Sequence, residues 1–94
     1  MNTAAREFSL QFLYQCRADK LQFFSEPHWK EFLKHHQVPA KVRPFSESLC
    51  RGVLNDLQRL NDEIERSSPE WSIARIALID LLVLQIACFE LLES

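Results

Sequence analysis

The pattern of apolar residues divides the chain into four helical segments, and the last of them is apolar on every side. Between residues 71 and 92, seventeen of twenty-two residues are apolar, and the five polar ones form no stripe around a helix. Such a helix lies in a large core, crosses a membrane or packs against a partner. Because a chain of 94 residues buries only about two-thirds of its unfolded surface, we predict that a partner covers part of this helix.

Three amphipathic segments precede the terminal one. The first runs from residue 4 to about residue 17, and the second begins at a serine cap followed by a proline at 25–27 and ends before residue 39. The third is expected to be one long helix over residues 44–64, because its apolar residues keep helical spacing for about six turns. Phe23 and Phe24 lie in the first connection, and we expect both rings to enter the core.

Composition supports an all-α fold in a single domain over residues 1–94. The chain has one glycine, four prolines and no run of alternating β-branched residues, which is typical of helices joined by short loops. The pattern also permits a break in the terminal helix near Ala77. The three cysteines have no paired metal spacing, which predicts buried thiols in a reducing cytosol. No apolar signal-peptide core is present at the N-terminus, so we expect a cytoplasmic protein.

Charge is divided unevenly along the chain. Residues 1–44 carry seven basic and four acidic side chains, whereas residues 45–94 carry four basic and nine acidic ones. This division permits a nucleic-acid face on the first part and a basic protein partner on the second, although a solvated surface is the commoner reason for such a split.

Asp80 is the most informative single residue, because it lies in the middle of the apolar run. An acid there costs about 2.5–3.5 kcal/mol on membrane-insertion scales, which argues against a membrane span. Two interpretations stay open: a buried acid with a partner in the chain, or a charge held for a lysine or arginine of another protein. The sequence carries no catalytic, metal-binding or cofactor-binding motif. We therefore expect a protein that is not an enzyme and needs no cofactor.

Three segments carry a resemblance to a known family. The first helix reads A-R-E-F-S-L-Q-F-L-Y-Q from residue 5, and residue 45 begins F-S-E-S-L-C-R-G-V. The end of the chain reads W-S-I-A-R-I from residue 71, then I-D at residue 79 and F-E-L at residue 89. In order and approximate spacing these segments resemble the motifs of the NusB family of transcription antitermination factors.

The resemblance implies a compact helical bundle, with a first helical subdomain and a long apolar terminal helix. It also implies an RNA-binding protein of the bacterial cytosol. Family members bind boxA RNA together with NusE, the small-subunit ribosomal protein, in antitermination complexes on RNA polymerase. By this analogy Arg6 and Gln11 match positions that touch RNA, and Tyr14 and Asp80 match positions that face NusE.

The sequence departs from the family pattern in three respects. The family's arginine-rich opening is reduced here to Arg6, so we expect weaker RNA binding unless Lys30, Lys34, Lys41 or Arg43 compensates. Of these, Lys30 and Lys34 are the predicted RNA-binding residues. Leu81 and Gln85 stand where the family commonly has basic residues. The family normally continues after Y-E-L with two more helices, so we expect a C-terminally short form. A homodimer through the terminal helices, with Leu81 and Gln85 near the contact, would then supply the cover.

Two functions remain open. The first is an RNA-binding antitermination factor that works with NusE. The second is a self-associating helical interaction module that has lost RNA recognition. A third reading, the similar domain fused to ribosomal RNA cytosine methyltransferases, lacks support because this chain carries no catalytic domain.

Overall fold

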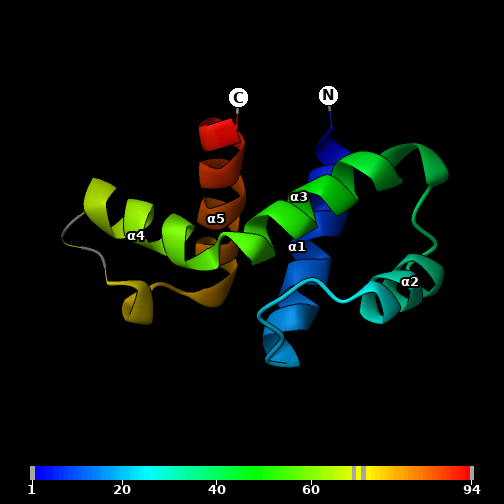
Figure 1. Cartoon of the computed structure of the whole chain (residues 1–94), viewed down its shortest axis with the longest axis horizontal. Coiled ribbons are helices and arrows are strands. Elements are labelled where there is room, and N and C mark those ends of the chain that lie inside the picture. Colours follow the sequence, from blue (N-terminus) through cyan, green and yellow to red (C-terminus); the bar gives the residue numbers. More distant parts are fainter. Residues whose placement is uncertain (1, 69, 71, 94) are drawn as a thin grey trace.

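The computed structural model describes residues 2–68, 70 and 72–93, and this part of the chain forms helices and no strand. The predicted all-α fold class is therefore confirmed. The helices are α1 (Thr3–Ala18), α2 (Glu26–His35), α3 (Arg43–Asn55), α4 (Leu57–Ser67) and α5 (Leu78–Glu93), with the short 3-10 helices η1 (Ala40–Val42) and η2 (Ile73–Arg75). Figure 1 shows α5 beside α1, with α2 on the opposite side of α1 and α4 at the far end.

The first two helices have the bounds that the sequence predicts. The Ser25 hydroxyl accepts a hydrogen bond from the backbone N–H of His28, and a proline stands in the first turn of α2. The two aromatic residues of the connection behave differently from the prediction. Phe24 packs against Phe12 with ring centroids 5.9 Å apart, but Phe23 is 62% exposed. The expectation that both rings enter the core is wrong for Phe23, because Phe12 and Phe24 with the rings of α2 already fill that part of the interior.

The long third helix of the prediction is divided into α3 and α4 at Asp56. The backbone N–H of Asp56 bonds to the carbonyls of Gly52 and Val53, while its own carbonyl accepts from the N–H of Leu60. Asp56 thus ends one helix and begins the next, with φ −116° and ψ 22°. Asparagine and aspartate at positions 55 and 56 are poor helix formers, and Figure 1 shows the change of direction there. The apolar spacing continues through the bend, which is why the pattern suggested a single helix.

The terminal segment breaks where the sequence permits it. The chain forms η2, is extended at Ile76 and becomes α-helical only at Leu78, so the predicted helix over 71–92 is shorter than expected. Trp71 lies outside the described residues. The helices α1, α3 and α4 pack on one side of α5. They bury Leu82 and Ile86, so the chain covers more of α5 than we expected.

The core is formed where α1, α3 and α5 cross. Ser9 on α1 and Ser46 on α3 are both fully buried, and their hydroxyl oxygens are 2.8 Å apart, so small side chains let these helices approach closely. The absence of a side chain at Gly52 likewise allows close packing, here by the ring of Phe89 on α5. A Cβ atom added at Gly52 would lie 2.0 Å from Cζ of that ring. The single glycine of the chain therefore leaves a notch, the space beside Gly52 that the ring of Phe89 fills. Across the described residues, every helix is too short or too polar to cross a membrane.

Candidate functional site

Arg6 lies near the start of α1 and is tied to the end of α5. Its Nε donates to Oε1 of Glu90 at 2.9 Å, and its Nη2 donates to Oε2 at 2.7 Å. These hydrogen bonds raise the pKa of Arg6 and lower the pKa of Glu90. The guanidinium also lies 5.7 Å from the ring centre of Phe45. One edge of Arg6 is thus engaged with Glu90, while Nη1 takes no part in these bonds.

Gln11 and Tyr14 share a groove of about 460 Å³ on the side of α1. The groove is also lined by His36 at the end of α2 and Ile79 at the start of α5. Tyr14 and Ile79 are each 46% exposed, and Nε2 of His36 is buried without a hydrogen-bond partner among the described residues. The structure therefore brings two of the predicted residues together on a mixed apolar and polar surface.

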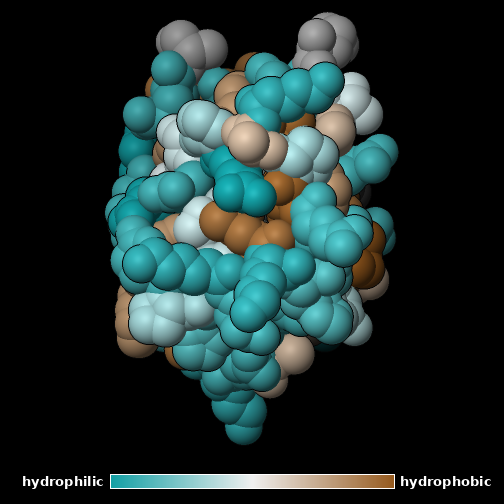
Figure 2. All heavy atoms as spheres, turned by 90° about the vertical axis from the view of Figure 1, so that its right-hand side faces the viewer, coloured by the Kyte–Doolittle hydropathy of each residue, from teal (hydrophilic) through white to brown (hydrophobic). Residues whose placement is uncertain are grey.

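The second feature is the set of basic side chains between residues 17 and 43, which are Arg17, Lys20, Lys30, Lys34, Lys41 and Arg43. Lys30 and Lys34 are exposed and lie one turn apart on the same face of α2. Among the described residues, the ion pairs of basic side chains involve Arg6, Arg51, Arg59 and Arg66. No lysine or arginine of residues 17–43 pairs with a described acid. Figure 2 shows that the α2 side of the molecule is mainly hydrophilic around a small hydrophobic patch.

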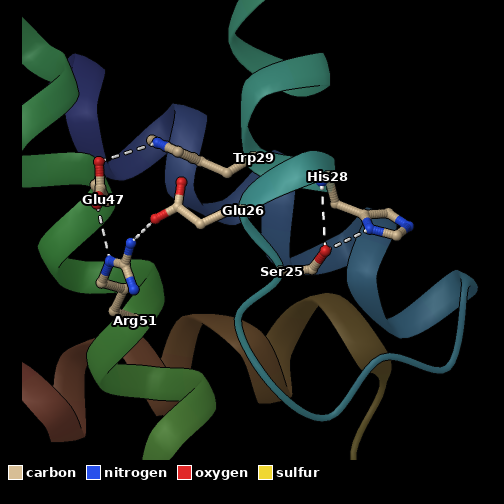
Figure 3. A network of polar contacts seen from close by, with 6 residues as sticks. All are labelled: Ser25, Glu26, His28, Trp29, Glu47 and Arg51. Carbon is tan, nitrogen blue, oxygen red and sulfur yellow. Dashed lines mark hydrogen bonds and ion pairs between the residues drawn. The ribbon is translucent and has the colours of Figure 1, made fainter.

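A polar network fixes α2 against α3, as Figure 3 shows. The indole Nε1 of Trp29 donates to Glu47 at 3.2 Å, and Nε of Arg51 donates to the other oxygen of Glu47 at 2.8 Å. Arg51 also pairs with Glu26 and lies 4.1 Å from the ring centre of Phe24. These bonds set the direction in which α2 presents its lysines. Sequence reasoning missed the network, although the spacing of Glu47 and Arg51 by one helical turn was a signal for that one pair.

Asp80 is exposed at the start of α5 and makes no hydrogen bond or ion pair with a described residue. The interpretation as a buried, paired acid is therefore wrong. Its position follows from the break before Leu78, which sets Asp80 in the first turn of α5. Asp80 and Arg75 line a groove of about 630 Å³ with an apolar floor that includes Val83.

Leu81 and Gln85 are not at the surface. They are 3% and 2% exposed, and Nε2 of Gln85 donates to Oδ1 of Asn61 on α4 at 2.8 Å. The expected contact between subunits through these two residues is wrong, because the chain's own helices cover them. The exposed large apolar residues of α5 are instead Ile79, Val83, Leu91 and Leu92. Glu90, which sequence reasoning did not place in a site, is the residue that contacts Arg6.

The three cysteines are free thiols, and Cys16 and Cys50 are buried. Burial raises the pKa of Cys16 to about 11 and that of Cys50 to about 12, so neither is a thiolate at neutral pH. Within the described ranges, no group of three or more His, Cys, Asp or Glu side chains is arranged to hold a metal ion.

The sequence model described as the NusB family matches residues 3–94. The chain belongs to the NusB family. The resemblance seen in the three sequence segments is thereby confirmed. A transcription antitermination protein NusB of Anaeromyxobacter dehalogenans strain 2CP-1 is 36% identical over 94 residues, which cover 98% of this chain and 64% of that protein.

Two other NusB proteins show the same similarity. The transcription antitermination protein NusB of Syntrophus aciditrophicus is 34% identical over 89 residues, which cover 93% of this chain and 53% of that protein. The transcription antitermination protein NusB of Desulfotalea psychrophila is 35% identical over 92 residues, and the match covers 93% of this chain and 64% of that protein. The chain thus spans less than two-thirds of the length of these NusB relatives. No solved structure matches the chain at a significant level.

Proposed function

We propose that this NusB-family chain is a transcription antitermination factor of the bacterial cytoplasm. It binds single-stranded boxA-type RNA together with the ribosomal protein NusE, within an antitermination complex on RNA polymerase. Relatives that match nearly the whole chain are named transcription antitermination proteins. The observation that carries the proposal is the set of basic side chains of residues 17–43 that have no acidic partner among the described residues.

RNA binding draws most of its affinity from neutralised phosphates. Lys30 and Lys34 supply this charge from one face of α2, which the network at Glu47 holds in place. Arg6 offers its remaining edge to a phosphate or a base, while Glu90 keeps the guanidinium in a fixed orientation. Gln11 is exposed and can both donate to and accept from the edge of an unpaired base.

The partner surface is the groove at Tyr14 with the adjoining Asp80. Tyr14 and Ile79 offer half-exposed apolar area, and Asp80 follows Ile79 in the first turn of α5. An exposed acid that has no partner among the described residues suits a basic ribosomal protein, because opposite charges guide association. NusE is the basic partner that we assign to this surface.

The test compares the affinity for boxA RNA across variants of the whole chain by fluorescence anisotropy. The double variant Lys30→Gln and Lys34→Gln should bind more weakly, with a log–log salt slope smaller by about 1.4 if two phosphate contacts on a single strand are lost. The control is Arg59→Gln with Arg66→Gln, which removes the same charge from residues paired on α4. If the two double variants bind boxA RNA with equal affinity, the assignment of RNA to α2 is contradicted. A separate measurement tests the protein partner: an Asp80→Asn variant that binds NusE as tightly as the wild type contradicts the assignment of NusE to Asp80.

A second candidate function is a self-associating interaction module. The half-exposed apolar residues Ile79 and Val83 favour it, because they leave part of α5 uncovered by the described residues. Since Leu81 is buried, the informative substitution is Val83→Arg. Sedimentation at micromolar concentration distinguishes the candidates: a dimer that Val83→Arg converts to a monomer, without selective RNA binding, supports the module.

A further inference from the structure

A cavity of about 390 Å³ lies between the end of α1, α4 and α5. The residues named individually above for RNA and NusE do not line it, and these are Arg6, Gln11, Lys30, Lys34, Tyr14 and Asp80. Its floor is made of leucine side chains from α1, α3, α4 and α5. Four amide side chains and two cations also line it, and these are Gln22, Gln58, Asn61, Gln85, Arg17 and Lys20. This combination is unlike the mixed-charge groove beside Asp80.

The amides are organised by contacts within the chain. Gln85 is almost fully buried and donates to Asn61 at 2.8 Å, which fixes both amide groups at the inner wall. Gln58 is exposed at the mouth and donates to Asp62 at 2.9 Å. Amide side chains present donors and acceptors side by side, which is the pattern needed to bond the edge of a nucleobase.

The cations stand at the end of α1. Arg17 and Lys20 are exposed, and neither forms an ion pair with a described acid. Lys20 has φ 58°, and the hydrogen bond from the N–H of Leu21 to the carbonyl of Cys16 at 2.8 Å holds the turn. Two cations beside a cavity with an apolar floor suit a ligand that has a flat ring and an anionic group.

We propose that this cavity binds one nucleotide, with its phosphate at Arg17 and Lys20 and its base on the leucine floor beside Asn61. The proposal deepens the function proposed above and rests on it, because the nucleotide is assigned to the bound RNA strand. Phe23 follows the cavity-lining Gln22 in the chain, and its ring is 62% exposed. Exposed aromatic rings near cations are typical of surfaces on which bases of single strands stack. A free mononucleotide has the same chemistry, so the experiment separates the two sources.

The experiment uses the whole chain and two readouts. Titration of the ¹⁵N-labelled protein with uridine and adenosine monophosphates is followed at the side-chain amide signals of Asn61 and Gln85. Anisotropy with labelled single-stranded RNA is measured for Gln58→Trp, which fills the mouth of the cavity, and for Gln58→Ala, which leaves it open. The double variant Arg17→Gln and Lys20→Gln is measured beside the control pair at Arg59 and Arg66.

Supporting results are shifts of both amide signals and a loss of RNA affinity in Gln58→Trp but not in Gln58→Ala. The double variant Arg17→Gln and Lys20→Gln should bind RNA more weakly by on the order of tenfold at 0.1 M salt, because two contacts with phosphate are lost. If mononucleotides shift the signals but Gln58→Trp binds RNA normally, the site serves a free nucleotide and the assignment to RNA is overturned. If the wild type binds RNA and every cavity variant matches the control, only this inference fails. A wild type without RNA affinity overturns both proposals.

Discussion

Substitution of Gly52 by alanine should destabilise the protein, although alanine is the better helix former. In an exposed helix this change stabilises by about 1 kcal/mol. Here the added Cβ would lie 2.0, 2.3 and 2.7 Å from three ring carbons of Phe89, against an ordinary carbon–carbon contact of about 3.5–4 Å. The ring must retreat by more than about 1 Å or leave the notch, and overpacking of this kind costs about 1–3 kcal/mol. The difference between this cost and the helix-forming gain is a net loss of up to about 2 kcal/mol in the free energy of unfolding.

Urea unfolding followed by circular dichroism measures this loss, and a thermal scan should show a fall of about 4–8 °C for each 1 kcal/mol lost in a domain of this size. The control is a double-mutant cycle with Phe89→Leu, which shortens the side chain that occupies the notch. In that background Gly52→Ala should be neutral or stabilising, because the obstacle is gone and the helix preference remains. If Gly52→Ala raises the urea midpoint while Phe89 is intact, the packing argument is refuted.

Three further predictions concern the backbone, an ion pair and the thiols. Gln37 has φ 50° at the end of α2, so Gln37→Gly should raise the free energy of unfolding by about 1 kcal/mol; no gain in urea midpoint contradicts this. The hydrogen bond from Arg6 lowers the pKa of Glu90. The stability that this ion pair contributes is therefore fully present above the ordinary carboxyl pKa of about 4.3, and it is lost as the pH falls through the lowered pKa. Glu90→Gln should therefore flatten the acid side of the stability–pH curve, and an unchanged curve counts against the pair. Cys50 is buried with a pKa of about 12, whereas Cys88 is partly exposed; mass spectrometry should find that iodoacetamide modifies Cys88 first in the folded protein.

The local signals in the sequence predicted the helices that depend on neighbouring residues alone. The apolar stripe of α1, the serine cap and proline at the start of α2, and the permitted break near Ala77 act within a few residues, and each agrees with the structure. The family resemblance also came from the sequence, because its motifs lie on single helices. Exposure of Lys30 and Lys34 followed from the polar face of an amphipathic helix in the same way.

The features that join distant segments depend on how the helices pack in three dimensions. Arg6 and Glu90 are 84 positions apart, and the crossing of α1 with α5 brings them together. The terminal helix has apolar residues on all sides, so its pattern could not tell which side faces inward; the packing of α1, α3 and α4 buries Leu81 and Gln85 and leaves Asp80 outside. The positions of most helices could be predicted from the amino-acid pattern alone, since helical periodicity is a local property. Which faces of those helices are buried depends on contacts across the whole fold, and these decided where each side chain of the candidate site lies.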